Sequence, residues 1–210
     1  MDRYRCFDEL RICETEERDY RIRLRRGIRP VAIMAPHGGK IERGTSQLAE
    51  AIAGAEYAFY SFEGIKDRNN HFLHITSDRF DEPQALALAK RVRTVVTIHG
   101  AKGRDRKIYT GGQNLDLEQQ LLDALSYAGF TAMHDPSPTR QGMGMTNICN
   151  RGYGGKGIQL ELTRGFRKHL FNPVNSGINW IPNELFYIFV ETMRTVLERE
   201  QHIQARSQAM

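Results

Sequence analysis

The sequence predicts a single α/β domain, built on a mixed, mostly parallel sheet with helices on both faces. Three observations lead to this fold class. Strand-like and helix-like segments alternate from Val31 onward, which is the pattern of α/β proteins. Several of the strand-like segments are short apolar runs, as buried strands are. The chain has 210 residues, which is enough for one domain with a sizeable core.

The expected elements follow in chain order. Residues 1–30 are charge-dense and form an N-terminal extension, in which alternating polar and apolar side chains over residues 19–25 predict an edge strand. Val31 opens the first core strand. Further strands are expected at residues 56–62, 72–76, 93–98, 107–109, 130–133 and 157–164. Helices are expected at residues 46–54, 83–91, 116–127 and 182–201, and a flexible tail at residues 205–210.

Two helices carry end signals. Thr45 or Ser46 is the expected cap of the first helix, and Gly54 its end. The second begins at Pro83, with Asp81 or Glu82 as its cap.

The exit of the first core strand carries the first candidate site residues. The apolar run that begins at Val31 stops at Pro36 and is followed by His37, Gly38 and Gly39. Glycine takes positive φ without steric cost, so the chain can turn there and bring Glu42 back toward His37. Ligands of α/β sheets bind at such strand ends. The alternative is a loop His and a solvated carboxylate.

Two later strands repeat or complement this design. Residues 93–98 form an apolar, β-branched strand that ends in His99 and Gly100. Residues 157–164 form a strand in which Glu161 lies on the face opposite Ile158, Leu160 and Leu162. A Glu in the middle of a strand needs either a partner or a chemical role.

Two His and one Glu make a familiar catalytic zinc set, because three protein ligands leave the fourth position of Zn²⁺ open for water. The metal lowers the pKa of that water and polarises a substrate carbonyl. A second Glu that does not bind the metal can move the proton to a leaving amine. Glu161 fits this second role.

Several segments together resemble the poly-γ-glutamate hydrolase family of bacilli and their phages, which is similar in fold to zinc carboxypeptidases. They are APHGGKIERGTSQLAEAIAG, HITSDRFDEP, VTIHGAKG, NICNRG and GIQLELTRGFR, and they span about Val31 to Arg167. The resemblance implies one Zn²⁺ per chain, with His37, Glu42 and His99 as ligands and Glu161 as general base. Classical carboxypeptidases place the ligand Glu three residues after the His, whereas Glu42 follows His37 by five.

The same resemblance suggests residues that bind substrate. In zinc carboxypeptidases an Asn-Arg pair holds a substrate carboxylate, and Asn150-Arg151 looks similar. An Arg fork suits a carboxylate, although an ion pair with a loop Asp is the alternative for Arg151. Asn147 and Arg164 are further candidates for binding side carboxylates, whereas Arg167 and Lys168 are expected at the surface. The irregular residues 134–145 and the basic loop 100–107 are expected to border the site.

The chain carries a formal net charge of +5, which attracts polyanions. Poly-γ-glutamate and nucleic acid are both polyanions, so the charge does not choose between them. The cluster Arg21, Arg23, Arg25 and Arg26 suggests either nucleic-acid binding or a solvated strand face.

Other features limit the setting. The Cys count of three, without regular spacing, predicts free thiols, with Cys149 packed inside. No apolar run reaches the length of a membrane span, and the N-terminus is too charged for a signal peptide. We therefore expect a chain that is cytoplasmic as synthesised and that would need cell lysis or another export route to reach external polymer. We also expect a monomer.

The leading hypothesis is a zinc-dependent hydrolase that cuts γ-glutamyl amide bonds in poly-γ-glutamate. A deacylase of small N-acyl acidic amino acids is an alternative with the same chemistry. A basic, phage-related nucleic-acid-binding protein is an alternative from another class, and it leaves His37 and His99 at strand ends without a role.

Overall fold

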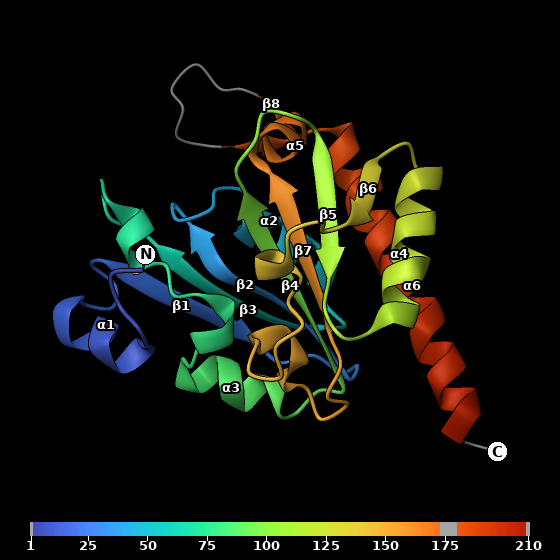
Figure 1. Ribbon diagram of the computed structural model, residues 1–210, viewed down its shortest axis with the longest axis horizontal. Helices are drawn as coiled ribbons and strands as arrows, with labels where there is room; N and C mark the ends of the chain where they lie inside the picture. Colours follow the sequence, from blue (N-terminus) through green and yellow to red (C-terminus); the bar gives the residue numbers. More distant parts are fainter. Residues whose placement is uncertain (1, 173–179, 209–210) are drawn as a thin grey trace.

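The computed structural model describes residues 2–172 and 180–208 and contains a seven-stranded mixed sheet of strand order β1-β3-β2-β4-β7-β5-β6 (Figure 1). Strands β3, β2, β4 and β7 are mutually parallel, whereas β1 pairs antiparallel with β3 at one edge and β5 pairs antiparallel with β7. The last strand, β6, is parallel to β5. The strand bounds are β1 Tyr20–Arg25, β2 Val31–Gly39, β3 Ala58–Gly64, β4 Thr94–Ala101, β5 Lys107–Gly111, β6 Thr131–His134 and β7 Ile158–Thr163.

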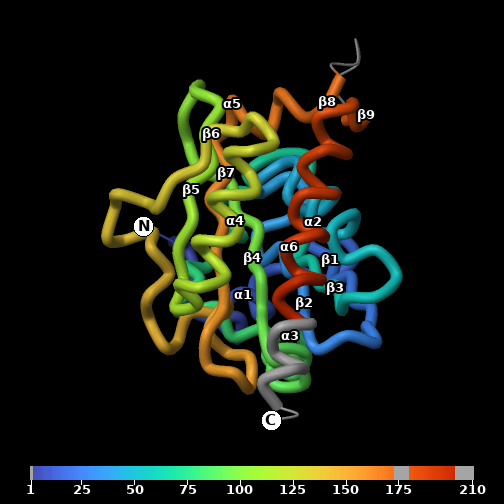
Figure 2. The backbone as a smooth tube through the Cα atoms, turned by 90° about the vertical axis from the view of Figure 1, so that its right-hand side faces the viewer, coloured from blue at the N-terminus to red at the C-terminus, as the bar shows by residue number. Residues whose placement is uncertain are grey.

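Helices cover both faces of this sheet, as the sequence predicts. On one face, α2 (Thr45–Ala53), α4 (Leu115–Tyr127), α5 (Arg164–His169) and α6 (Glu184–Gln208) share one apolar cluster with the strands. Figure 2 shows α4 and α6 side by side on this face. The other face is covered by α1 (Phe7–Cys13) and α3 (Pro83–Ala89), which share a second cluster.

Strand β2 explains why its sequence is a continuous apolar run. Val31 and Ile33 pack in the first cluster, whereas Ala32 and Met34 pack in the second. A parallel strand buried on both faces has no solvent side, so polar alternation is absent.

Helix α3 and the end of α2 follow local sequence signals, whereas the start of α2 does not. The Glu82 side chain accepts hydrogen bonds from the Gln84 and Ala85 N–H groups and caps α3. Gly54 ends α2 with φ +51°, as expected. The prediction of Thr45 or Ser46 as the α2 cap is wrong, because Gly44 occupies that position with φ +96° and both residues lie inside the helix.

The strand expected at residues 72–76 is also wrong. This segment contains the 3₁₀ turn η1 (Asn70–Leu73) and leads into a second, η2 (Ser77–Arg79). The neighbouring strand β3 already pairs with β1 and β2, so no sheet edge is left for it there.

The last helix also differs from its expected bounds. Residues 181–182 pair with β8 (Phe171–Asn172) as strand β9 (Ile181–Pro182), so α6 begins only at Glu184. It continues to Gln208, which makes residues 205–208 of the expected tail helical, while residues 209–210 lie outside the described residues. Residues 173–177, expected as a loop, also lie outside them. Within the described ranges, no helix is both long and apolar enough to cross a membrane.

Candidate metal centre

His37, Glu42 and His99 converge at the carboxyl ends of β2 and β4. Glu42 Oε2 lies 3.5 Å from His37 Nδ1 and 3.9 Å from His99 Nδ1, and the two Nδ1 atoms are 3.1 Å apart. All three candidate ligand atoms lie within 4.8 Å of one another. The structure therefore brings together the three residues that the sequence suggests as metal ligands.

The glycine pair after His37 makes this convergence possible. Strand β2 shifts register between Ala35 and Gly38, and Gly39 takes φ +61°. A Cβ atom at Gly38 would collide with the hydroxyl groups of Ser46 and Ser61, so a side chain does not fit there. The Glu42 N–H then donates to the His37 carbonyl at 2.9 Å and closes the turn, which returns the carboxylate to the imidazole.

Hydrogen bonds around the three residues fix their orientation. His37 Nε2 donates to the Ile75 carbonyl at 2.8 Å. Because a carbonyl only accepts, Nε2 carries a proton, and Nδ1 is the ring nitrogen that faces the cluster. The Gly100 N–H donates to Glu42 Oε2 at 2.8 Å, and Ser77 Oγ lies 3.4 Å from His99 Nε2. Such outer partners are typical of metal-binding residues.

The electrostatics of the cluster also suit a cation. Burial alone would raise the pKa of Glu42, but His37 and His99 beside it lower that pKa to about 2. Burial and the neighbouring His37 lower the pKa of His99 to about 3. The carboxylate is therefore ionised and His99 neutral at neutral pH, as metal ligands must be. Burial lowers the pKa of His37, but Glu42 beside it raises that pKa above its usual value, so a metal ion would take the place of a proton on this ring. A set of two buried imidazoles and one half-buried carboxylate fits Zn²⁺ with an open position.

Glu161 lies beside this cluster. Strand β7 pairs with β4 in a register that sets Glu161 opposite His99, so both side chains lie on the same face of the sheet. Burial, followed by the charge of Glu42, raises the pKa of Glu161 well above 4.5. Its Oε1 accepts a hydrogen bond of 3.3 Å from Gln159 Nε2. Glu161 is therefore a carboxyl group that can hold a proton near neutral pH.

A cleft of about 330 Å³ gives access to these residues. His74 is one of its walls, with its ring 3.9 Å from that of His37 between centroids. Asp2 fixes His74 through Nδ1 at 2.8 Å and also accepts from the Thr76 N–H and hydroxyl. The charge-dense N-terminus thus supports the site from outside, which the sequence gives no means to predict.

The residues suggested for substrate binding are placed differently. Asn147 lines the cleft and donates to Gln159 Oε1 at 3.2 Å. Asn150 is buried, and its Nδ2 donates to the Gly142 and Gly144 carbonyls. Its amide hydrogens are therefore already used in hydrogen bonds to the loop that contains Gly142 and Gly144. Arg151 is half-buried, Arg164 is exposed, and neither lines the cleft.

The cations that do line the cleft are Lys102 and Arg140. Both are exposed at its rim. Arg140 donates through Nε and Nη2 to the buried Asp135, which leaves Nη1 without a partner in that ion pair. Lys102 and Arg140 lie in the two loops that the sequence suggests as borders of the site, but the sequence does not identify either residue as a substrate contact.

Arg167 is buried, not at the surface as expected. Its guanidinium donates to three backbone carbonyls, those of Leu162 at 3.1 Å, Arg43 at 2.6 Å and Ala101 at 3.4 Å. These carbonyls end strands β7 and β4 and the loop after β2, so one side chain ties together the three segments of the site. Gly100 leaves the space that it fills.

Comparison with known proteins agrees with this geometry. The profile of the poly-γ-glutamate hydrolase family matches residues 4–192. The chain is 38% identical over 194 residues to the UPF0714 protein YndL of Bacillus subtilis (strain 168), covering 91% of this chain and 76% of that protein. The chain belongs to the poly-γ-glutamate hydrolase family, and it is an enzyme of that class.

Two solved structures show the same fold over nearly the whole chain. A bacteriophage poly-γ-glutamate hydrolase superposes with a TM-score of 0.90 at 26% identity, covering 97% of this chain and 100% of that one. Zinc-free YndL superposes with a TM-score of 0.88 at 36% identity, covering 95% and 99%. The prediction of a single α/β domain with a mostly parallel sheet is confirmed.

Proposed function

We propose that this chain hydrolyses γ-glutamyl amide bonds in poly-γ-glutamate, with one Zn²⁺ held by His37, Glu42 and His99. The observation that carries the proposal is the convergence of these three residues, whose ligand atoms lie within 4.8 Å of one another. Glu161 lies beside them, and its carboxyl group has a raised pKa. Membership of the poly-γ-glutamate hydrolase family and the likeness to zinc-free YndL support the substrate and the metal.

Glu161 is the proton carrier in this mechanism. A zinc ion bound at the three ligands supplies the Lewis acidity that polarises the amide carbonyl and acidifies water. Glu161 takes a proton from the water that attacks the carbonyl carbon and delivers it to the amine nitrogen as the C–N bond breaks. The raised pKa of Glu161 suits this transfer, because it lets the carboxyl hold the proton between the two steps.

The rim of the cleft binds the side carboxylates of the substrate. Lys102, Arg140 and Asn147 are the groups whose position supports this role. Asp135 holds Nε and Nη2 of Arg140, so Nη1 is the donor left for a substrate carboxylate. The position of these groups at the rim favours Arg140 over Arg151 and Arg164 as the main substrate cation. A substrate with a carboxylate on every residue would neutralise this positive rim.

Metal analysis and product analysis of the purified protein test the proposal together. We expect about one zinc per chain and progressive shortening of poly-γ-glutamate, lost on chelation and restored by Zn²⁺. Release of amino acids from small N-acyl glutamates, with intact polymer, would instead indicate the deacylase. Metal-free protein that still cuts the polymer at an unchanged rate would contradict the role of His37, Glu42 and His99.

A further inference from the structure

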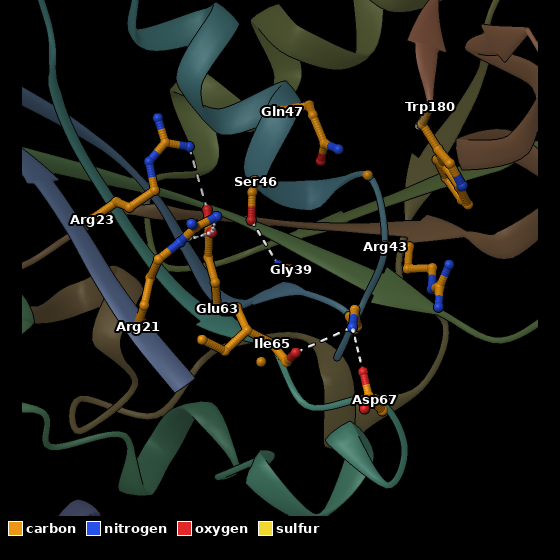
Figure 3. A pocket seen from close by; sticks show the side chains of 13 residues that line it. Arg21, Arg23, Gly39, Arg43, Ser46, Gln47, Glu63, Ile65, Asp67 and Trp180 are labelled. Carbon is orange, nitrogen blue, oxygen red and sulfur yellow. Dashed lines mark hydrogen bonds and ion pairs between the residues drawn. The ribbon is translucent and has the colours of Figure 1, made fainter. Parts of the chain in front are cut away.

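A second hollow, of about 500 Å³, lies on the other side of the loop that carries Glu42. Figure 3 shows its wall of charged side chains, with Arg21 and Arg23 from the edge strand on one side and Arg43 with Trp180 on the other. It shares no lining residue with the cleft of the metal centre. The edge-strand arginines are therefore part of a concave surface, not of a flat solvated face.

The hollow has an excess of positive charge. Four cations line it, Arg21, Arg23, Lys40 and Arg43, against two carboxylates, Glu63 and Asp67. Glu63 is 3% exposed and receives both arginines, at 2.7 Å from Arg21 and 3.4 Å from Arg23. Arg23 also pairs with Glu50, so two carboxylates balance these two guanidinium groups. The excess positive charge of the hollow therefore rests on Lys40 and Arg43, against Asp67.

The other two cations, Lys40 and Arg43, lie at the rim of the hollow, where Lys40 is held in place and Arg43 is exposed. Lys40 Nζ donates to the Ile65 and Lys66 carbonyls at 3.1 and 2.9 Å, which fixes the ammonium group over the hollow, and the fully exposed Asp67 lies 4.0 Å from it. Arg43 is exposed, and within the described parts of the chain its guanidinium makes no ion pair. Such a cation is available to an incoming anion.

The loop places these cations next to the metal centre. Arg43 directly follows the ligand Glu42, so their Cα atoms are about 3.8 Å apart. Lys40 follows His37 by three residues. A γ-linked glutamate adds five backbone bonds, so an extended polymer advances about 6 Å per residue. A chain that crosses this loop from the metal centre reaches the hollow within a few residues.

We propose that this hollow is a second carboxylate-binding site, which holds residues of a poly-γ-glutamate chain remote from the bond being cut. The inference rests on the proposed function for the identity of the ligand. It assigns to the edge strand and the loop 38–44 a role in recognising long substrate, because a short oligomer that fills the cleft does not extend to the hollow.

Trp180 offers a direct probe, because it is the only tryptophan of the chain and lines the hollow. The inactive Glu161→Gln protein is titrated with long poly-γ-glutamate while tryptophan fluorescence is recorded. We expect a saturable change that weakens as salt rises. Arg43→Gln in this background should raise the Kd about threefold, and Lys40→Gln with Arg43→Gln about tenfold, as for exposed ion pairs.

Arg91→Gln is the matched control. It removes the same charge from an exposed arginine just before β4, at the opposite ends of the parallel strands, and should leave the Kd unchanged. Equal weakening by Arg91→Gln and Arg43→Gln, or no fluorescence change on binding, overturns the proposal. Tighter binding of single-stranded DNA than of polymer at equal charge also overturns it in favour of a nucleic-acid site.

Kinetics in the active protein separate this site from the catalytic proposal. Arg43→Gln should lower kcat/KM for long polymer about threefold more than for a tri-γ-glutamate. An equal effect on both substrates contradicts the second site while leaving the proposed function intact. If the unmodified enzyme cuts neither substrate, the proposed function fails, and the fluorescence titration still decides whether the hollow binds polycarboxylate.

Discussion

Replacing Glu161 by Gln distinguishes three roles for this carboxyl group. The change keeps the size of the side chain and an acceptor oxygen for Gln159 Nε2, but removes the group that takes a proton. If Glu161 is the general base, the variant keeps its zinc and binds polymer but turns over slowly. If it is a metal ligand, zinc affinity falls together with activity. If it is only a structural carboxyl, kcat stays within a few-fold of wild type.

The size of the loss follows from what else lines the cleft. Removing an acid–base catalyst costs about 10²–10⁴-fold in rate, or about 3–5 kcal/mol at 1.36 kcal/mol per factor of ten. Among the described residues of the cleft, the other carboxylates are Glu42 and Asp78. Glu42 is a proposed ligand and already accepts the Gly100 N–H, so it cannot replace the base. We therefore expect a loss of about 10²–10⁴-fold.

The three measurements on one variant are metal content, melting temperature and the rate of amine release from polymer. Because burial and Glu42 disfavour an ionised Glu161, the metal-free Gln variant should be at least as stable as wild type at neutral pH. Wild-type turnover in a folded, zinc-loaded Glu161→Gln protein would refute the mechanism.

Three further variants test the support of the site. His99→Ala should lose zinc and activity together, and full zinc stoichiometry in that variant would exclude His99 as a ligand. Arg167→Met leaves three carbonyls without their donor, so the free energy of unfolding should fall by about 3 kcal/mol or more and zinc affinity should weaken. Arg167→Lys should recover part of both losses. An unchanged denaturant midpoint and unchanged zinc affinity in chelator competition would contradict the positioning role of Arg167. Burial opposes ionisation of Asp2, but hydrogen bonds from Thr76 and His74 lower its pKa from 3.8 to about 2, so its stabilising contribution is full above about pH 4 and is lost as the pH falls toward 2. The stability difference between wild type and Asp2→Asn should therefore be present at pH 6 and vanish near pH 2, and a pH-independent difference would contradict this account.

The convergence of the proposed ligands can be predicted from the sequence, because it depends on the ends of strands. His37 and His99 follow short apolar runs, and parallel strands bring their carboxyl ends to one edge of the sheet. Alternation along residues 158–163 set Glu161 apart from the buried leucines, and the register with β4 then placed it beside His99. These predictions needed only the local period and the direction of each strand.

The substrate and support residues could not be found in this way, because their roles depend on contacts between distant segments. Asn150 donates its amide hydrogens to backbone carbonyls six to eight residues earlier in the chain. These bonds hold Asn150 and its neighbour Arg151 against that loop, so closeness to Glu161 in the sequence does not bring Arg151 into the cleft. Arg167 looked like a surface cation, and only the meeting of three strand and loop ends gives its guanidinium buried acceptors. Motif spacing carries no information about either arrangement.

The five-residue spacing between His37 and Glu42 now has a physical explanation. A ligand three residues after the His would be reached by a tighter turn, whereas here the chain leaves the sheet at Gly39 and is closed by the bond from the Glu42 N–H to the His37 carbonyl. The Ser46 hydroxyl accepts the Gly39 N–H at 2.8 Å and anchors the turn to α2. The extra residues project away from the metal centre, and that is how one short loop supplies a ligand to the cleft and cations to the hollow behind it.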